Sequence, residues 1–324
     1  MKGMRRTALL LVVLLAHSCT CMEETAETER LIGWKGEVHR SSLAESHVQL
    51  PGGGRLPRVG FGTAGLGAGT EQAVRSALAA GYTLLDSAQA REWYREDLVG
   101  AALRASAVRR SDLFLTSKVH PRHLGFQRTQ RQVDVSLREL DTEYLDLLLL
   151  HYPKCWGDLC GGVVPEGTWR DSWRALEDAL HRGVVRSIGV SNFDVSELRE
   201  LLAFARAPVA VVQAHSDPFQ ANAELQALCA SHGIAFQAYS SLGSQHGHRI
   251  NPVLHAPPVL AAAASHNVSA AQVVLRWALQ RGQCVIPKSG DAGHMAANRR
   301  LDFQLDSAQM RDIDALDGKL PPLE

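Results

Sequence analysis

The chain has 324 residues, of which 45% are hydrophobic and 21% are charged. It is therefore long enough to bury the core of a sizeable α/β domain. Its 34 Lys and Arg residues balance its 34 Asp and Glu residues. A chain without net charge has no global field that attracts nucleic acid or an anionic membrane, so we expect neither as a partner.

Residues 1–21 have the pattern of a secretory signal peptide. Three basic residues, Lys2, Arg5 and Arg6, precede an apolar run over 8–16, and small residues follow it. The run is about half of the roughly 20 residues that span a bilayer as a helix. We therefore expect entry into the secretory pathway, to the ER lumen or the exterior, and no membrane association after signal removal. An uncleaved anchor and a cytoplasmic protein are the alternatives.

Residues 22–46 are polar and charged without periodicity, and we expect a flexible N-terminal arm there. The pattern changes at His47. Two short strand-like pieces flank the turn Pro51–Gly54 in HVQLPGGGRLPRVG, which predicts a β-hairpin. In a closed barrel such a hairpin would act as a plug across one end. The remaining chain, 47–324, shows no linker and is predicted to form one domain.

From residue 59 onward, strand-like and helix-like segments alternate with a regular spacing. The predicted strands cover 59–64, 82–88, 112–119, 145–152, 185–192, 209–215, 235–243 and 284–289. The predicted helices cover 70–81, 95–106, 129–142, 169–183, 195–206, 223–233 and 269–282. The run LDLLLLHY is continuously apolar, as expected of a parallel strand buried on both faces. Eight strands alternating with helices in one domain predict a closed (β/α)8 TIM barrel.

Four of the six cysteines lie outside the predicted signal peptide. Cys155 and Cys160 share a Gly-rich loop, where we expect a local disulfide in an oxidising compartment. Cys229 and Cys284 lie in apolar surroundings and are predicted to be buried free thiols. The loop offers fewer than the four ligands that zinc usually takes, so no metal is expected there.

Polar residues stand at the ends of seven consecutive predicted strands. They are Asp86, Lys118, His151, the pair Ser191 and Asn192, Gln213, Tyr239 and Lys288. In a (β/α)8 barrel the carboxyl ends of all strands meet at one rim, where reactive groups gather. The sequence therefore predicts a site built by these residues.

Seven short stretches and one longer stretch also resemble the aldo-keto reductase family. They are GFGTAG, LLDSAQ, LTSKV, LLLLHYP, IGVSNF, AYSSLGS, VIPKS and, near the end, LDFQLDSAQMRDIDALD. The resemblance extends from about residue 47 to residue 318. It implies a (β/α)8 barrel that binds NADP(H), or in some members NAD(H), across the barrel mouth.

The resemblance places the family's catalytic Asp, Tyr, Lys and His on Asp86, Tyr94, Lys118 and His151. A carbonyl that accepts hydride develops negative charge on oxygen, so a proton donor must stand beside it. We expect Tyr94 to be that donor. The Lys118 ammonium, held by Asp86, would favour the phenolate, and His151 would hold the carbonyl oxygen.

Tyr94 departs from the family pattern because it follows Asp86 at a longer interval than usual. The stretch SAQAREWYRED carries a small insertion, and a simple count would place Arg91 at the tyrosine position. We choose Tyr94 because EWYREDLVG continues directly into the usual helix, with Trp93 as a pocket wall. The alternatives are an ordinary buried ion pair for Asp86 and Lys118 and a packed core histidine for His151.

The same resemblance implies which residues bind the cofactor. Ser191, Asn192 and Gln213 would hold the nicotinamide amide, and Tyr239 would stack on its ring. The pyrophosphate and adenosine phosphates would meet Ser240, Leu242, Ser244, Lys288, Ser289, His294 and Asn298. His294 stands where the family commonly has arginine for the 2′-phosphate, and histidine lacks the bidentate fork of arginine. We expect NADP(H), with NAD(H) as the alternative.

The expected function is thus NAD(P)H-dependent reduction of an aldehyde or ketone by a monomeric enzyme. The alternative is a nucleotide-binding or scaffold barrel with weak or lost activity. The short tail after Gly318 predicts an open pocket, bordered by the loop 154–168 with Trp156. Asn267 begins an N-glycosylation acceptor pattern, Asn267-Val268-Ser269, although Ser269 would serve equally well as a helix cap.

Overall fold

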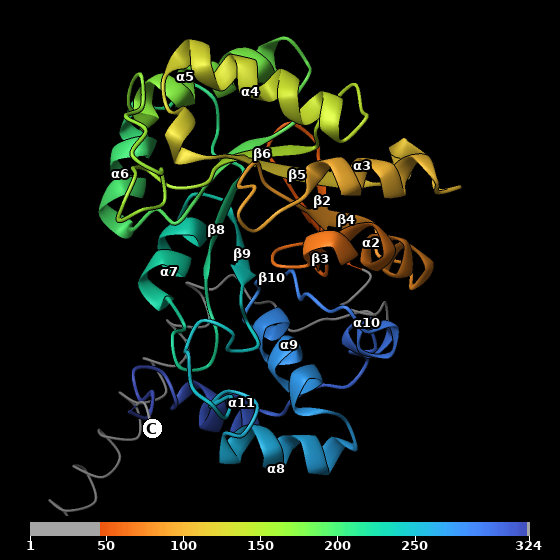
Figure 1. Ribbon diagram of the computed structural model, residues 1–324. Helices are drawn as coiled ribbons and strands as arrows, with labels where there is room; N and C mark the ends of the chain where they lie inside the picture. Colours follow the sequence, from red (N-terminus) through yellow and green to blue (C-terminus); the bar gives the residue numbers. More distant parts are fainter. Residues whose placement is uncertain (1–45, 323–324) are drawn as a thin grey trace, which may run out of the picture. The chain divides into compact units, whose positions relative to one another are not determined.

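The computed structural model describes residues 46–322. The predicted signal peptide, 1–21, and all but the last residue of the predicted arm, 22–46, lie outside the described residues. The compact unit to which the described residues belong contains the (β/α)8 barrel that the sequence predicts, with strands in the middle and helices around them (Figure 1).

Eight parallel strands form the sheet. They are β3 (Phe61–Gly62), β4 (Leu84–Asp86), β5 (Phe114–Val119), β6 (Leu147–Leu150), β7 (Ile188–Ser191), β8 (Val211–His215), β9 (Ala235–Tyr239) and β10 (Cys284–Val285). Each strand pairs with its neighbour in the sequence, so the order runs unbroken from β3 to β10. This is the strand order that the alternating segments of the sequence predict.

The barrel closes between its first and last strands. Val59, just before β3, forms a parallel bridge with Val285 of β10. The Gly60 amide donates to the Val285 carbonyl at 2.8 Å, and the Gly62 amide donates to the Pro287 carbonyl at 3.2 Å. A side chain at position 62 would bring its Cβ to 2.7 Å from the Ile286 carbonyl oxygen. Glycine at this position therefore permits the close approach of the two strands.

Helices follow the strands and cover the outside of the barrel (Figure 1). They are α2 (Thr70–Ala79), α3 (Glu96–Arg104), α4 (Phe126–Glu139), α5 (Trp169–His181), α6 (Val195–Phe204), α7 (Ala223–Ser231), α8 (Pro257–His266), α9 (Ala270–Gln280), α10 (Ala292–Arg299) and α11 (Ser307–Asp314). All seven predicted helices form, although α4 begins three residues earlier than predicted. The helices α8, α10 and α11 were not predicted. None of the described helices is by itself long and apolar enough to cross a membrane, and α8 and α9, which are long enough together, bend by 98° between them.

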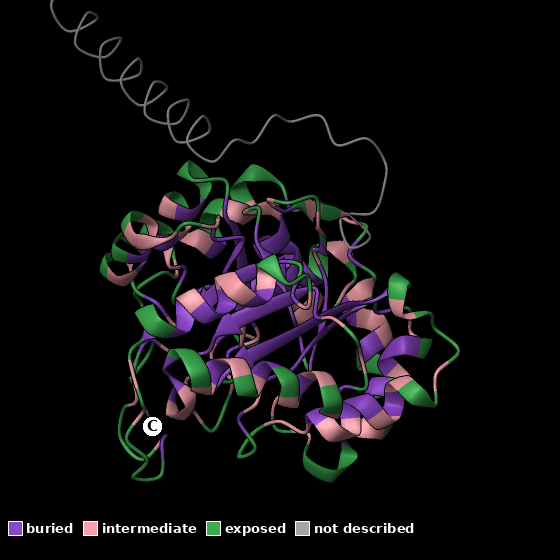
Figure 2. Ribbon diagram, turned by 90° about the horizontal axis from the view of Figure 1, so that it is seen from above, coloured by how far each residue is buried: buried purple, intermediate pink, exposed green. Residues whose placement is uncertain are grey.

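Alternate strand residues face the barrel axis and the helices, and this alternation divides the core into two clusters. Leu147 and Leu149 of β6 belong to the inner cluster, whereas Leu148 and Leu150 pack in the outer one between strands and helices. Figure 2 shows the strands of the barrel largely buried, with exposed residues mainly on the outer faces of the helices and in loops. A strand buried on both faces needs apolar residues at every position, which explains the unbroken run in β6.

The predicted N-terminal hairpin is confirmed. The strands β1 (His47–Gln49) and β2 (Arg55–Pro57) pair antiparallel, with Val48 opposite Leu56. Leu50 and Leu56 are buried and belong to the inner cluster, so the hairpin packs against the interior of the barrel. They join it at the amino-terminal ends of the strands, with Leu84 and Phe114, which are the first residues of β4 and β5.

The structure contains the helix cap at Ser269 and the two buried thiols that the sequence predicts. Ser269 caps α9, because its Oγ accepts from the Gln272 amide at 3.2 Å. Asn267 is exposed in the left-handed conformation at the end of α8, and its glycosylation stays a prediction. Cys229 and Cys284 are buried free thiols, as predicted, and burial raises their pKa values to about 12 and about 11.

One buried carboxyl lies outside the barrel interior, between α3 and the sheet. Glu96 in the first turn of α3 is 1% exposed and accepts hydrogen bonds from the Ser117 and Ser136 hydroxyls at 2.5 and 2.8 Å. Burial raises the pKa of Glu96 to about 7, against the lowering effect of both hydrogen bonds. The carboxyl is thus harder to ionise in the folded chain than in the unfolded one.

This raised pKa predicts that the stability of the fold decreases as the pH rises from about 4.5 to 7. Protonated Glu96 contributes fully to the free energy of unfolding below the pKa of the unfolded chain. This contribution is lost as the pH rises through the pKa of the folded chain, and the total loss is about 3 kcal/mol. We expect Glu96→Gln to remove most of this decrease, because glutamine does not ionise. The measurement is urea unfolding between pH 4.5 and 8. The exposed Glu143→Gln is the control, and equal slopes in both variants would contradict the assignment.

Candidate active site

The carboxyl ends of the strands surround a cavity of about 580 Å³. Of the residues predicted for the site, the cavity is lined by Asp86, Tyr94, His151, Ser191, Asn192, Gln213, Tyr239, Ser240, Leu242, Ser244 and Lys288. Lys118 is fully buried directly behind this lining. Side chains alternate between the two faces of a strand, so residues two positions apart face the same side. Asp86 follows the inward-facing Leu84 by two positions, and His151 follows the inward-facing Leu149 by two, so both face the barrel axis.

Lys118 and Asp86 form an ion pair inside the barrel. The Lys118 Nζ lies 2.6 Å from the Asp86 Oδ1 and donates to the Ser87 carbonyl at 3.0 Å. Burial by itself would lower the pKa of Lys118, but the Asp86 carboxylate, with help from Tyr94, raises it above its ordinary value. Lys118 is therefore a permanent cation at the floor of the cavity.

The second oxygen of Asp86 is held from across the barrel. The Gln213 amide donates to the Asp86 Oδ2 at 2.8 Å and to the Gln237 Oε1 at 2.7 Å. The predicted nicotinamide-binding residue Gln213 is thus tied into the same network as the ion pair. Its remaining carbonyl oxygen is the part available to a ligand amide. Gln237 is a member of this network that the sequence analysis did not identify.

Tyr94 reaches the ion pair because the insertion before it folds into a turn. The Trp93 and Tyr94 amides both donate to the Ala90 carbonyl, at 2.9 and 2.8 Å, and the Gly65 amide donates to the Trp93 carbonyl at 2.6 Å. Arg91, the residue that a simple count selects, lies half-exposed at the surface and pairs with Asp97 at 2.7 Å. The structure therefore brings Tyr94, and not Arg91, to the cavity.

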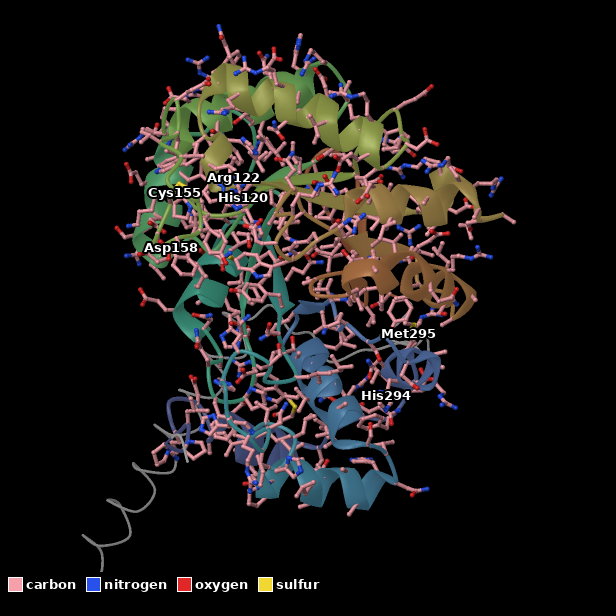
Figure 3. All side chains as sticks on the ribbon, viewed as in Figure 1. His120, Arg122, Cys155, Asp158, His294 and Met295 are labelled. Carbon is pink, nitrogen blue, oxygen red and sulfur yellow. A yellow bond between two sulfur atoms is a disulfide. The ribbon has the colours of Figure 1, made fainter. Side chains whose placement is uncertain are left out.

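A second contact fixes the same turn from the side of β5. The Glu92 carboxylate lies 2.8 Å from the His120 Nε2 and 3.3 Å from the Arg122 guanidinium. Both partners follow the end of β5, where Figure 3 labels them side by side. Since Lys118 lies next to the end of the same strand, this contact links the position of Tyr94 to that of Lys118. The sequence analysis did not identify Glu92 or His120.

The Tyr94 hydroxyl is within hydrogen-bond reach of Lys118, with its oxygen 3.5 Å from the Nζ. The ammonium also lies 4.8 Å from the centre of the Tyr94 ring. Burial raises the pKa of Tyr94, and the nearby Lys118 opposes that rise. We expected Lys118 to favour the phenolate, and its contribution has that sign, but burial outweighs it. The phenol is consequently protonated at neutral pH.

His151 completes the cluster from the end of β6. Its ring centre lies 6.0 Å from that of Tyr94 in an edge-to-face arrangement, and the Asn192 amide donates to its backbone carbonyl at 2.9 Å. Burial, then Lys118 and His120, hold the pKa of His151 well below its usual value. The ring is therefore neutral and can donate a hydrogen bond. Its buried Nδ1 has no partner among the described residues.

The predicted nicotinamide-binding residues form a connected group on the opposite wall. The Tyr239 hydroxyl donates to the Asn192 Oδ1 at 2.6 Å, and the Asn192 amide donates to the Ser191 Oγ at 3.1 Å. Amide and hydroxyl groups beside an aromatic ring match the chemistry of a carboxamide on a flat heterocycle. The residues present therefore fit a nicotinamide.

Three predicted cofactor residues lie outside the cavity, before and within α10. Among the described residues, Ser289 hydrogen-bonds the backbone of Asp291. His294 is exposed in the first turn of α10, and Asn298 is buried on that helix. Figure 3 shows His294 on the far side of the barrel from Cys155. The structure thus separates these residues from the catalytic cluster, as a contact to the distant adenosine end of an extended dinucleotide requires.

Aromatic residues form the outer wall of the cavity. The ring centre of Tyr152 lies 4.9 Å from that of His151, and the ring centre of Trp156 lies 5.9 Å from that of Tyr152. Trp156 stands in the loop that the predicted disulfide between Cys155 and Cys160 closes, which the structure confirms. None of the described residues after Gly318 lines the cavity. No role for Tyr152 was predicted from the sequence.

These features define a (β/α)8 barrel with a Tyr–Lys–Asp–His cluster at the carboxyl ends of its strands. The model of the aldo/keto reductase family matches residues 58–318. The chain is 37% identical over 279 residues to an aldo-keto reductase of Mycolicibacterium vanbaalenii, covering 86% of this chain and 94% of that one. It is 36% identical to the morphine 6-dehydrogenase of Pseudomonas putida, covering 83% of this chain and 90% of that protein.

Solved structures give the same result. The Bombyx mori aldo-keto reductase in complex with NADP superposes with a TM-score of 0.77 at 30% identity, covering 85% of this chain and 94% of that one. The chain belongs to the aldo/keto reductase family. It is thus a member of an oxidoreductase family that uses nicotinamide cofactors and acts on small carbonyl compounds.

Proposed function

We propose that the protein reduces an aldehyde or ketone to the alcohol with NAD(P)H, and that Tyr94 supplies the proton. The observation that carries this proposal is the position of the Tyr94 hydroxyl. It lies 3.5 Å from the Lys118 Nζ, which in turn lies 2.6 Å from Asp86, at the wall of a cavity that His151 also lines.

The residues divide the reaction among them. A reduced nicotinamide held by Asn192 and Gln213 would supply the hydride for the carbonyl carbon, and Tyr94 would give its hydroxyl proton to the carbonyl oxygen. The Lys118 ammonium stabilises the tyrosinate that remains, and Asp86 keeps Lys118 charged. Neutral His151 donates a hydrogen bond that orients the carbonyl oxygen between Tyr94 and the hydride donor.

The aromatic walls of the cavity suit a substrate with an apolar body. Trp93, Tyr152 and Trp156 all line the cavity, whereas the ion pair of Asp86 and Lys118 lies at its floor. A flat aromatic or aliphatic carbonyl compound would pack its body between these rings and place its polar end on Tyr94 and His151. We therefore propose aryl aldehydes as substrates. Glyoxal reductase of Bacillus subtilis, 35% identical, is named for a much smaller carbonyl compound.

Replacing the proton donor tests the proposal directly. We expect Tyr94→Phe to lower kcat for aryl aldehyde reduction by roughly 10²–10⁴-fold, because a general acid contributes about that much. The dissociation constant for NADPH should stay unchanged, since the hydroxyl is not assigned to the cofactor. Steady-state kinetics and fluorescence quenching by NADPH measure the two quantities.

Tyr144→Phe is the matched control, because that tyrosine packs under Arg110 and Arg186 away from the cavity. The control should keep full activity. If the wild-type chain binds NADPH but turns over none of a broad aldehyde panel, the alternative of a barrel without reductase activity is favoured instead.

We propose NADP(H) as the preferred cofactor, with His294 as a weak partner of the adenosine 2′-phosphate. Lys288, a basic residue, lines the cavity along the proposed cofactor path. The His294 side chain is 79% exposed and lies 3.9 Å from Asp291, an acidic neighbour that would oppose a phosphate. These surroundings support a modest preference for NADP(H) over NAD(H).

His294→Arg should strengthen that preference. An exposed guanidinium adds up to about fivefold in affinity for NADPH through charge-assisted hydrogen bonds to the 2′-phosphate, with no gain for NADH. The measurement is a pair of fluorescence titrations with the two nucleotides. His232→Arg adds the same charge at the end of α7 and should change neither affinity. An equal gain for NADH in the His294 variant would place the 2′-phosphate elsewhere.

We also propose that the enzyme works in the secretory pathway. The charged and apolar pattern of residues 1–21 and the disulfide between Cys155 and Cys160 support this location. N-terminal sequencing of the protein from producing cells should find a mature start near residue 22. A start at Met1, together with fractionation with the cytosol, would contradict the proposal.

A further inference from the structure

Two histidines and one aspartate meet beside the candidate active site. His215 ends β8, Asp217 follows it in the next loop, and His246 comes from the segment after β9 (Figure 1 shows these two strands side by side). One donor atom from each residue lies within 4.8 Å of the other two. Asp217 is fully buried, and the His246 and His215 side chains are 6% and 12% exposed.

One carboxylate oxygen faces both imidazole rings. The Asp217 Oδ2 lies 2.8 Å from the His215 Nε2 and 2.7 Å from the His246 Nε2. The first contact is a hydrogen bond, but the second lacks hydrogen-bond geometry. The buried His246 Nε2 therefore has no hydrogen-bond partner among the described residues, although it lies against the carboxylate. The other oxygen, Oδ1, accepts from the Phe219 amide at 2.8 Å.

A buried nitrogen without a hydrogen-bond partner, beside a buried carboxylate, is an arrangement that a cation can stabilise. Leaving a buried polar atom without a partner is unfavourable, and an ion shared by the three atoms would satisfy all of them. Two imidazole nitrogens and one carboxylate oxygen are a donor set of Zn²⁺, whereas Ca²⁺ and Mg²⁺ prefer oxygen ligands throughout. We propose that His215, Asp217 and His246 bind Zn²⁺, with water as the fourth ligand.

Zinc binding would change the spacing of the three donor atoms, which now lie within 4.8 Å of one another. Ligand atoms of a tetrahedral zinc lie about 3.3 Å apart. The two contacts of Asp217, at 2.8 and 2.7 Å, would therefore open by roughly half an ångström, and the two imidazole nitrogens would adopt the same spacing. Of the three proposed ligands, His215 also lines a cavity of about 340 Å³ beside α7.

The site is distinct from the catalytic cluster but adjacent to its cofactor wall. The His215 ring stacks on Tyr239, with ring centres 5.9 Å apart and an angle of 28° between planes. None of the three ligands lines the catalytic cavity. The proposal therefore does not depend on the reductase activity and stands or falls separately from it.

His248 provides a matched control because both of its ring nitrogens are already occupied. Its Nδ1 lies 2.9 Å from the His246 carbonyl oxygen, and its Nε2 lies 3.0 Å from the Pro321 carbonyl oxygen. It stands two residues from His246 in the same segment, with its ring centre 6.5 Å away. Replacing it removes a histidine without removing a proposed ligand.

The test is Zn²⁺ binding by the full chain, prepared without a histidine tag. We expect one saturable Zn²⁺ per chain by calorimetry, and for Co²⁺ the intense visible absorption of a four-coordinate site. His246→Gln and Asp217→Asn should each weaken Zn²⁺ affinity by at least about tenfold. His248→Gln should leave it unchanged. Circular dichroism verifies that each variant is folded.

Several results would overturn the assignment. These are no saturable Zn²⁺ binding by the wild-type chain, a six-coordinate Co²⁺ spectrum, or wild-type affinity in both ligand variants. An equal loss in His248→Gln would also overturn it. The Co²⁺ spectrum of the wild-type protein decides the question even if a ligand variant does not fold.

Discussion

The candidate active site depends on one buried ion pair. Lys118 and Asp86 are fully removed from solvent inside the barrel, and their contact of 2.6 Å is what makes either charge tolerable there. Two neighbouring strands supply them, and the alternation along each strand points both side chains to the axis. Gln213 then bonds the second oxygen of Asp86 from the far wall. The pair thus ties together three of the eight strands at the level of the cavity floor.

The same pair determines what Tyr94 can do. Burial keeps the phenol protonated, so in the proposed reaction a proton is present to be given, and the adjacent ammonium would stabilise the anion that remains. Neither influence alone produces a useful acid. A buried tyrosine without Lys118 would hold its proton too firmly, and an exposed one beside a lysine would compete with water for the same contact. The long interval between Asp86 and Tyr94 is acceptable because the inserted residues form a turn that Glu92 anchors to His120.

The sequence predicts the barrel well because its signals are local and repeated. Continuous apolar runs such as 147–150 indicate buried parallel strands, and polar residues directly after them indicate the rim. The ion pair follows from the same logic once the strand order is known. By contrast, α8 begins with two prolines and continues as an alanine-rich run that buries little more than Val259, Ala262 and Ala263. Such a segment carries a weak amphipathic signal, so its helix could not be predicted from periodicity.

Groups that meet only through tertiary contacts could not be predicted in the same way. Glu92 and His120 are 28 positions apart and belong to different connections, and the sequence pattern of neither suggests an anchor for Tyr94. The cluster of His215, Asp217 and His246 needs the loop after β9 to fold back over the end of β8. No spacing rule for metal ligands covers that distance along the chain.

Strand β8 shows how both sites arise from one structural rule. Gln213 and His215 are two residues apart, so both side chains leave the strand on the same face. Gln213, deeper in the barrel, meets the ion pair, whereas His215, at the strand end, meets the ring of Tyr239 and the Asp217 carboxylate. Tyr239 therefore separates the proposed zinc site from the proposed nicotinamide position by the thickness of a single ring. A shift of His215 by half an ångström would be passed directly to that ring, because packed side chains transmit displacement rather than absorb it.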